Sequence, residues 1–275
     1  AIYEPRFLNC MYGFRPNRGC HDAIKELYKR LNNTKICYIV DADIKGFFDH
    51  MKHEWIIKFL HLYIKDPNII GLVKKYLKVG VIDGGELMMN EEGSAQGNII
   101  SPILANIYMH NVLTLWYKFI ITKECKGDNF LIVYADDFVA GFQYKWEAEN
   151  YYKLLKERME KFGLQLEESK SRLLQSGAYI ARAKQKSGES TRLETFDFLG
   201  FTFYCGRSRK GMPYIMPKTS SKKFRQKIRD IKVWIYANRD QSLKKLMGML
   251  NLKLVGHYRY YGISFNGRMI SNYKQ

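Results

Sequence analysis

The amino-acid sequence predicts an α+β fold that is followed by a basic helical segment. Three observations support this prediction. Strand-like runs rich in Val, Ile and Phe are arranged as hairpins, amphipathic helical stretches lie between them, and after residue 217 the pattern changes to helices alone. Strands and helices intermixed with antiparallel hairpins are typical of α+β domains. With 275 residues, of which 46% are hydrophobic, the chain can build a substantial core.

The first half of the chain alternates strand and helix signals. Residues 35–44, "KICYIVDADI", form an apolar β-rich run that ends in acids and predict a buried strand. Residues 50–64 have the helical period, with Asp49 as the expected N-cap. Residues 79–90 have two strand-like arms around a Gly-Gly pair, which favours a hairpin, and a loop follows. Ser101 and Pro102 are suited to begin a helix that runs to about residue 117.

The second half begins with "FLIVYADDFVAGF", residues 130–142, which predicts a second hairpin with two acids at its turn. Residues 144–162 predict an amphipathic helix that Gly163 ends at the C′ position. A short strand is expected through residue 166, residues 181–194 are expected to be an exposed loop, and residues 196–217 are expected to form a third hairpin. From residue 220 the helices begin, and we expect a domain boundary at about 217–218.

The positive charge is concentrated near the C-terminal end. The formal net charge is +18, and residues 207–275 contain 17 lysines and arginines against two acids. A basic block interleaved with Tyr and Trp favours a polyanion-binding face, so nucleic acid is the expected partner; an anionic membrane surface and a merely solvated face are the alternatives. Lys222, Lys223 and Arg225 are the candidate contacts at the start of this helical segment.

The remaining composition excludes several classes of protein. The five cysteines are scattered without a C-x-x-C pair, which favours reduced thiols in a cytoplasmic protein over disulfides or a zinc site. The first residues have no signal-peptide pattern. The longest uncharged run, residues 98–117, contains Pro102, Asn106, His110 and Asn111, so we expect a buried helix and a soluble protein without a membrane partner.

Two acidic strand ends suggest metal-dependent chemistry. Asp136 and Asp137 are adjacent in the second hairpin, which on its own is compatible with an ordinary turn. Asp43 closes the first buried strand, and Asp41 shares its face. If the two strands are neighbours, these carboxylates converge at one edge of a sheet. Mg²⁺ prefers such oxygen ligands, and two such ions can assist an in-line phosphoryl displacement.

Six motifs occur in order between residues 13 and 203: "GFRPNRGCHDAI", "DADIKGFFD", "GSAQGNIISPILANIYMH", "YADD", "GLQLEESKS" and "FDFLGF". Together they resemble the reverse transcriptase encoded by group II introns, also called the intron maturase. The tail "LNLKLVGHYRYYG" is similar to the thumb, or maturase, segment of that family, so the resemblance covers nearly the whole chain. It implies a right-hand polymerase fold with partial fingers at 1–35 and 52–97, an antiparallel palm at 36–51 and 98–217, and a basic helical thumb at 218–275.

The resemblance also implies roles for individual residues. Asp43, Asp136 and Asp137 match the catalytic carboxylates that hold two Mg²⁺ ions, and the backbone carbonyl of Ile44 matches a further ligand. Phe48 matches the aromatic gate beside the 2′ position of the incoming dNTP; an ordinary core aromatic is the alternative. The nucleotide and template pocket is matched by Gln96 and Gly97.

Further matches concern the leaving group and the nucleic acid. Lys170 matches a lysine that assists the departing pyrophosphate, with a solvated lysine as the alternative. The primer-grip hairpin is matched by Phe198, Leu199 and Gly200. Arg15 and Arg18 are candidates to hold the template backbone, and a structural role is equally compatible with their positions.

The implied function is RNA-directed DNA synthesis on an RNA template with a DNA primer, together with binding of group II intron RNA for splicing and retrohoming in a bacterial or organellar interior. The alternatives are a splicing maturase without polymerase activity and a retron-type or diversity-generating reverse transcriptase. The sequence departs from the family pattern because it begins after the basic finger region that holds the triphosphate, and Asn98 stands where a glycine is usual. No endonuclease module is recognisable, and homodimerisation is left open.

Overall fold

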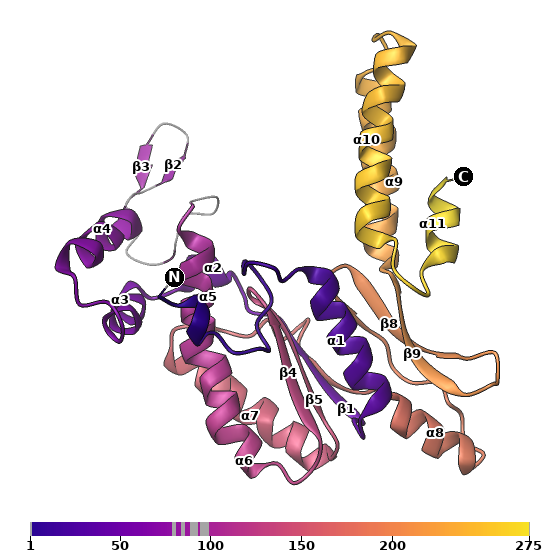
Figure 1. Ribbon diagram of the computed structural model, residues 1–275, viewed down its shortest axis with the longest axis horizontal. Coiled ribbons are helices and arrows are strands. Elements are labelled where there is room, and N and C mark those ends of the chain that lie inside the picture. Colours follow the sequence, from indigo (N-terminus) through magenta and orange to yellow (C-terminus); the bar gives the residue numbers. More distant parts are fainter. Residues whose placement is uncertain (1, 79–80, 84–85, 89–92, 94–98, 275) are drawn as a thin grey trace. The chain divides into compact units, whose positions relative to one another are not determined.

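The computed structural model describes residues 2–78, 81–83, 86–88, 93 and 99–274 (Figure 1). Its internal contacts divide the chain into two compact units, Ala1–Ile180 and Ala181–Gln275. The expected boundary at 217–218 lies inside the second unit. The assignment of residue ranges to fingers, palm and thumb therefore stays a prediction.

The first unit is built on a four-stranded antiparallel sheet. Its strands lie in the order β4-β5-β1-β6, and every neighbouring pair is antiparallel. The strands are β1 (Tyr38–Ala42), β4 (Asn129–Tyr134), β5 (Asp137–Phe142) and β6 (Arg172–Gln175). The predicted first strand and second hairpin are confirmed. The strand expected through residue 166 is reduced to one bridge between Ile44 and Leu166.

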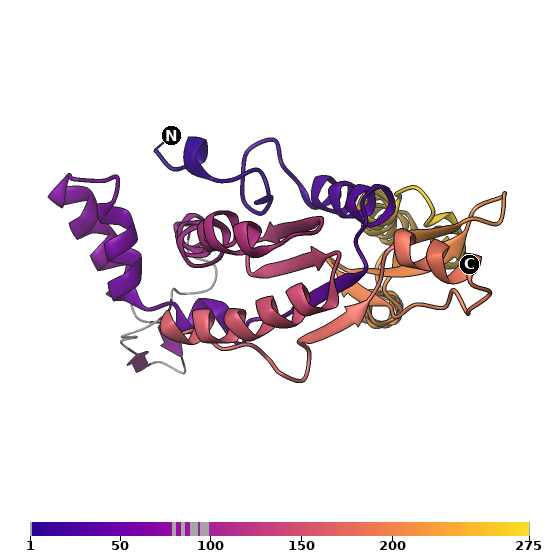
Figure 2. The same ribbon diagram turned by 90° about the horizontal axis from the view of Figure 1, so that it is seen from below.

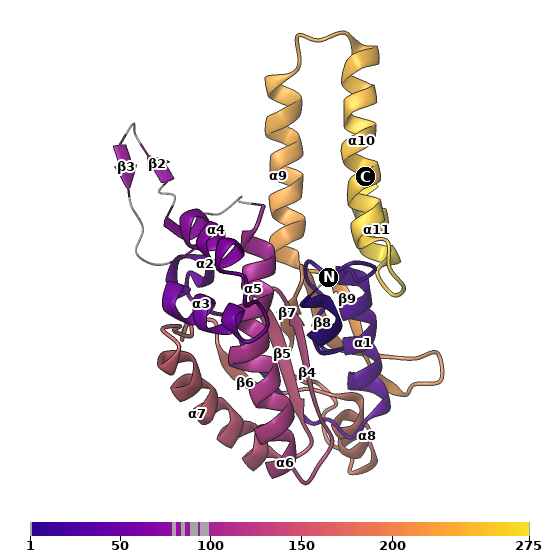
Figure 3. The same cartoon turned by 60° about the vertical axis from the view of Figure 1, so that its left-hand side comes forward.

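Helices cover the sheet and extend from it. They are η1 (Glu4–Arg6), α1 (Cys20–Asn33), α2 (Phe47–His50), α3 (His53–His61), α4 (Pro67–Lys78), α5 (Ser101–Met109), α6 (Thr122–Glu124) and α7 (Lys145–Lys161). Figure 3 shows α5 and α7 on one side of the strands and α1 on the other, and Figure 2 shows the same unit from below. The small hairpin of β2 (Val81–Asp83) and β3 (Glu86–Met88) follows α4, as predicted.

The start of α3 differs from the prediction. Asp49 lies within the short helix α2, and the residue before α3 is Lys52, which makes no side-chain capping bond. Gly46 adopts a left-handed φ of 51° just before α2. This turn starts a separate short helix, and Asp49 is therefore too early in the chain to cap the longer one.

The helix that begins at α5 is wider than an ordinary α-helix along part of its length. Two π-helical turns, η2 (His110–Thr114) and η3 (Tyr117–Ile121), continue α5 to α6. A π-helical turn interrupts the regular i→i+4 hydrogen-bond pattern, so carbonyl groups there can accept bonds from side chains. Arg158 of α7 bonds two of them, since its Nε donates to the Val112 carbonyl at 2.9 Å and its Nη2 to the Asn111 carbonyl at 3.2 Å.

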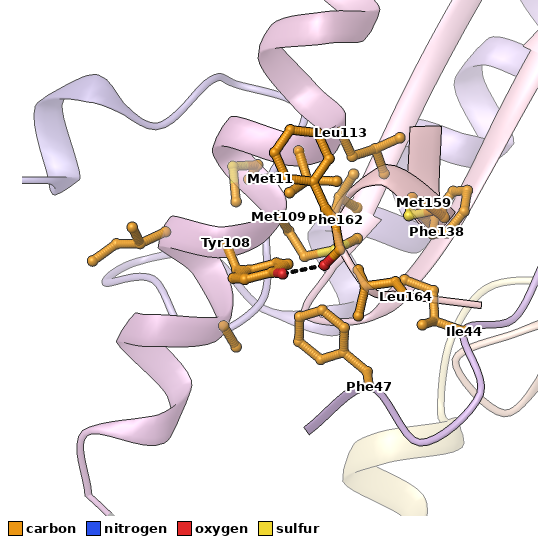
Figure 4. Close-up of a cluster of buried hydrophobic side chains, with 14 of the residues drawn as sticks. Met11, Ile44, Phe47, Tyr108, Met109, Leu113, Phe138, Met159, Phe162 and Leu164 are labelled. Carbon is orange, nitrogen blue, oxygen red and sulfur yellow. Dashed lines mark hydrogen bonds between the residues drawn. The ribbon is translucent and has the colours of Figure 1, made fainter. Parts of the chain in front are cut away.

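A hydrophobic core joins strands β1, β4 and β5 to helices α2, α3, α4, α5 and α7. Figure 4 shows side chains from β5, α2, α5 and the end of α7 meeting in it, with the Tyr108 hydroxyl donating to the Phe162 carbonyl. Helix α7 ends as predicted at Gly163, whose φ is 77°. Its N–H bonds to the Glu160 carbonyl and that of Leu164 to the Met159 carbonyl, which is the Schellman pattern.

The second unit contains a three-stranded sheet and a pair of long helices. Strands β7 (Phe196–Phe198), β8 (Phe201–Arg207) and β9 (Pro213–Thr219) form an antiparallel meander, which confirms and extends the third hairpin. Helices α9 (Ser221–Ala237) and α10 (Leu243–Tyr261) form a helical hairpin, and α11 (Gly267–Lys274) follows. No side chain of α9 is fully buried, so its basic residues remain exposed.

One predicted loop is a helix. Residues 181–194 were expected to be a loop because they are polar, but α8 extends over Ala178–Lys186. Its alanines, lysines and glutamine are good helix formers, and only the Ser-Gly pair after Lys186 ends the helix. Among the described residues, no helix is both long and apolar enough to cross a membrane.

Candidate catalytic site

The register of the sheet brings the predicted carboxylates to the same end of two neighbouring strands. Strand β1 pairs with β5 so that Ala42 lies opposite Phe138. Asp43 directly follows Ala42, and Asp137 directly precedes Phe138, so these two acids occupy the next opposing positions. Asp136 precedes Asp137 in the connecting turn. Strands far apart in the sequence therefore deliver all three acids to the same end of the sheet.

A tight turn presents Asp136. Tyr134 pairs with Asp137, so only Ala135 and Asp136 lie between the strands. Ala135 has a φ of 57°, and Asp136 does not have a positive φ. A positive φ at the first central residue alone is the pattern of a type II′ turn, which matches the twist of paired strands. Glycine is the usual residue at that position, so Ala135 keeps a strained conformation next to the carboxylate.

The carboxylates interact electrostatically. The pKa of Asp136 is raised, first because burial disfavours its charged form and further because the Asp43 carboxylate repels it, while its own backbone N–H acts in the opposite direction. Asp43 is 34% exposed at its side chain and accepts a bond of 2.8 Å from the ammonium of Lys170. This bond is the main reason that the pKa of Lys170 is raised, and Asp137 adds to the effect.

The backbone around Asp43 is fixed on both sides. Its N–H donates to the Ser171 hydroxyl at 3.2 Å, and its carbonyl accepts from the Glu167 N–H at 2.8 Å. These two bonds involve the backbone of Asp43 and not the Ile44 carbonyl, which is the predicted further ligand. Asp41, the other acid on this face of β1, pairs with Arg172 of β6 at 3.6 Å instead of joining the site.

This donor set fits a hard divalent cation. Within the described part of the chain, no group of three or more His, Cys, Asp or Glu side chains forms a ready cage for a metal ion. Mg²⁺, however, is commonly held by one or two carboxylates that share it with substrate phosphates. Asp43 and Asp136 repel each other at a half-buried position, and a divalent cation between them would relieve that repulsion.

The predicted nucleotide-pocket residues are only partly described. Phe48 is half-buried, and its ring packs edge-on against Phe47 with centroids 5.4 Å apart. Gln96 and Gly97 lie outside the described residues. Gly93, the described residue before them in the chain, donates its N–H to the Met51 carbonyl at 2.9 Å.

The two arginines predicted to contact the template, Arg15 and Arg18, bond to other residues of the protein. Arg15 is 9% exposed, forms an ion pair of 2.8 Å with Glu4 and donates to the carbonyls of Leu8 and Met11. Arg18 donates to both the carbonyl and the side-chain oxygen of Asn9 at 2.9 Å. These bonds favour the structural alternative, in which both arginines fold the loop that precedes α1.

The predicted primer-grip residues form a tight turn in the second unit. Leu199 and Gly200 connect β7 to β8 with φ values of 49° and 78°, which is the pattern of a type I′ turn. Leucine is unusual in a left-handed conformation. The Tyr260 hydroxyl donates to the Leu199 carbonyl at 3.0 Å, and the side chain of Phe198 is buried. The three candidate RNA contacts of α9 are exposed; they are Lys222, Lys223 and Arg225.

Three residues near the acids were missed from the sequence. Gly13 lies against the turn that presents Asp136, Ala135 lies within that turn, and Asn106 bonds the Gly13 carbonyl. Of the three, only Asn106 could be predicted from the sequence, because an asparagine inside an otherwise apolar helix needs a specific buried hydrogen-bond partner.

An antiparallel sheet with acids at the end of one strand and in the adjoining hairpin turn is the arrangement that the resemblance predicts for the palm of a nucleic-acid polymerase. Residues 3–203 match the model of the family "Reverse transcriptase (RNA-dependent DNA polymerase)". The chain therefore belongs to the reverse transcriptase family, and the resemblance inferred from the motifs is confirmed.

Individual relatives agree with this assignment. The chain is 38% identical over 128 residues to the group II intron-encoded protein LtrA of Lactococcus lactis, covering 46% of this chain and 20% of the relative. It is 41% identical over 113 residues to an uncharacterized 91 kDa protein in the cob intron of Schizosaccharomyces pombe, covering 41% and 14%. The chain thus spans about a fifth or less of these two relatives.

Solved structures support the fold. The telomerase of Candida albicans, in complex with a TWJ fragment of telomeric RNA, has a TM-score of 0.51 at 14% identity, covering 87% of this chain and 42% of that one. Apo telomerase from Candida tropicalis gives 0.51 at 16% identity, covering 74% and 35%. The right-hand polymerase fold class predicted from the sequence is confirmed.

Proposed function

We propose that this chain carries the DNA-synthesis site of a group II intron reverse transcriptase. The reaction is attack of a primer 3′-hydroxyl on the α-phosphate of a dNTP, with RNA as template and pyrophosphate as the leaving group. The observation that carries the proposal is that Asp43 and the Asp136–Asp137 turn converge at the same end of neighbouring strands in the proposed palm sheet. The match of residues 3–203 to the reverse transcriptase family and the repulsion between Asp43 and Asp136 both support a cation-dependent role.

In this proposal the acids hold two Mg²⁺ ions, which supply charge stabilisation for the phosphoryl transfer. Asp43 and Asp136 are the principal ligands, Asp137 assists them, and the Ile44 carbonyl is a further ligand. Lys170 forms an ion pair of 2.8 Å with Asp43, and its proposed role is to stabilise the departing pyrophosphate by its positive charge or by donating a proton. Phe48 would stand beside the sugar 2′ position of the nucleotide, with Gln96 and Gly97 in the same pocket.

Primer extension on an RNA template tests this assignment. Asp136→Asn keeps the size of the side chain but removes its charge, so extension should fall by about a thousandfold or more while RNA binding changes little. The matched control is Asp66→Asn, because Asp66 is an acid outside the site whose side chain bonds the Asn68 N–H, and asparagine preserves that bond. Extension by Asp136→Asn at the wild-type rate would refute the proposal.

A second function, binding of intron RNA that assists splicing and retrohoming, is favoured by the basic helices. The exposed cations of α9, Lys222, Lys223 and Arg225, are the proposed phosphate contacts. Replacing all three by Gln should lower the slope of log affinity against log salt by about two to three. Lys153, Lys156 and Lys161 of α7, replaced in the same way, serve as the control. Splicing by the Asp136→Asn variant separates the two functions, since RNA binding does not need that carboxylate.

The proposed location is the bacterial or organellar interior in which group II introns are transcribed. The primer-grip turn at Phe198, Leu199 and Gly200 is proposed to contact the primer strand. The arginines Arg15 and Arg18 are proposed to shape the loop before α1 rather than to bind the template, because their donors are already bonded.

A further inference from the structure

We infer that Gly13 and Asn106 are positioning residues that hold the Asp136 turn in place. This inference rests on the proposed role of that turn in catalysis. Neither residue reaches the reacting groups. Both act through the backbone of the turn, from segments that are distant from it in the sequence.

The chain before α1 runs along the outer edge of the β4–β5 hairpin. The N–H of Val133 donates to the Cys10 carbonyl at 2.8 Å, and the N–H of Tyr12 donates to the Val133 carbonyl at 2.8 Å. Met11, between them, is 1% exposed. Residues 10–13 therefore act as a short additional strand, which we call the brace, and it ends beside the turn.

Gly13 brings the brace against the backbone of the turn. A Cβ atom at this position would lie 2.4 Å from the backbone nitrogen of Ala135 and 3.0 Å from the carbonyl carbon of Tyr134. Both are backbone atoms, so no flexible side chain can move aside. Gly13 does not have a positive φ, which means that the close approach, rather than the backbone conformation, requires glycine here.

Asn106 of α5 holds the brace by a hydrogen bond to its last residue. This residue of α5 is 1% exposed, and its Nδ2 donates to the Gly13 carbonyl at 2.8 Å. Its Oδ1 is buried without a hydrogen-bond partner. The amide satisfies the buried Gly13 carbonyl and leaves its own oxygen without a partner, so the interaction that this side chain makes is the one that holds the brace.

The turn needs external support because Ala135 is held in a left-handed conformation, with a φ of 57°. An alanine gains by leaving this conformation, and that relaxation would move the Asp136 carboxylate. Because catalytic groups must be held to within a fraction of an ångström, a small relaxation is sufficient to lower the rate strongly.

Two variants test the inference. Asn106→Leu removes the bond to Gly13 while keeping the volume, and Gly13→Ala forces the brace off the turn. We expect kcat for primer extension to fall about tenfold or more in both, while KM for the primer–template and RNA affinity stay within about twofold. Gly71→Ala is the control, since an added Cβ there meets nothing within 4 Å.

Two further readouts distinguish positioning from folding. Asn106→Leu should stay folded and lose no more than about 1–3 kcal/mol in urea, because it leaves the buried Gly13 carbonyl without its donor while it removes a buried oxygen that has no partner. Mn²⁺ binding, followed by loss of the EPR signal of the free ion, should weaken about tenfold in both variants and more in Asp136→Asn. This readout does not require polymerase activity.

The outcomes are separable. If Asp136→Asn extends primers normally, the proposed function is wrong. If Asp136→Asn is inactive and binds Mn²⁺ weakly while Asn106→Leu behaves as wild type in both assays, only the positioning role is wrong. Failure of Asn106→Leu to fold would also overturn the inference, because it would make Asn106 a residue that the fold itself requires.

Discussion

Arg158→Met should destabilise the first unit without altering the proposed catalytic acids. Methionine keeps the length and apolar stem of the side chain but removes the guanidinium that bonds the carbonyls of Asn111 and Val112 at 3.2 and 2.9 Å. It also removes a cation–π contact, in which the guanidinium carbon lies 4.5 Å from the centre of the Phe162 ring. The two carbonyls belong to the π-helical turn η2 and lose their side-chain donor.

The magnitude follows from these contacts. A hydrogen bond to a charged group contributes about 1.5–3 kcal/mol, and a partly exposed cation–π contact about 0.5–1 kcal/mol. Because Arg158 is only half-buried, water can replace part of the lost bonding, and we expect a net loss of about 3 kcal/mol. In a unit of this size, that loss corresponds to a decrease in Tm of about 6–12 °C.

Urea unfolding followed by tryptophan fluorescence measures this loss, since the Trp116 ring lies 5.7 Å from the guanidinium. Lys153→Met is the matched control: it removes an exposed cation from the same helix and should change stability by less than about 0.5 kcal/mol. If Arg158→Met were no more destabilising than the control, the guanidinium would not be what stabilises the wide helical turns.

Two further predictions concern the site. Asp136→Asn should be more stable than wild type at neutral pH. Burial and Asp43 raise the folded-state pKa of Asp136, so its negative charge opposes folding above the unfolded pKa of about 3.9. The difference in urea midpoint between variant and wild type should therefore shrink as the pH falls toward that value. A variant less stable than wild type throughout pH 4.5–7.5 would contradict this sign. Tyr260→Phe should cost about 1 kcal/mol, because it removes the bond to the Leu199 carbonyl and keeps the stacking on Phe201. If the Leu199 turn contacts the primer, primer titrations should show KM for the primer–template rising more than kcat falls, and an unchanged KM would argue against that contact.

The parts of the fold that the sequence predicted are those with local signals. Apolar runs, the acids at their ends and Gly163 predicted the hairpin that carries Asp136, the strand before Asp43 and the end of α7, because strand period and cap chemistry are properties of neighbouring residues. Helix α8 contradicts the predicted loop because the helix propensity of its alanines and lysines outweighs the polarity that favours a loop.

What could not be predicted depends on contacts between distant residues. Arg15 could be read as a template contact or as a structural residue, and only the fold shows its guanidinium between Glu4 and two carbonyls. The bond from Asn106 to Gly13 joins residues 93 positions apart. The π-helical turns have no sequence signature that would separate them from an α-helix of the same apolar composition.

Part of the backbone strain in this protein lies in the two turns proposed to act in DNA synthesis and beside the brace. Among the described residues, five other than glycine have a positive φ, and three of them are Phe14, Ala135 and Leu199. Phe14 follows the brace, Ala135 precedes Asp136, and Leu199 forms the turn that Tyr260 bonds. Each such conformation costs about 1–3 kcal/mol and persists only where the surroundings hold it. At Ala135 the surroundings are Gly13 and the brace, which links the strain of the turn directly to the two positioning residues inferred above.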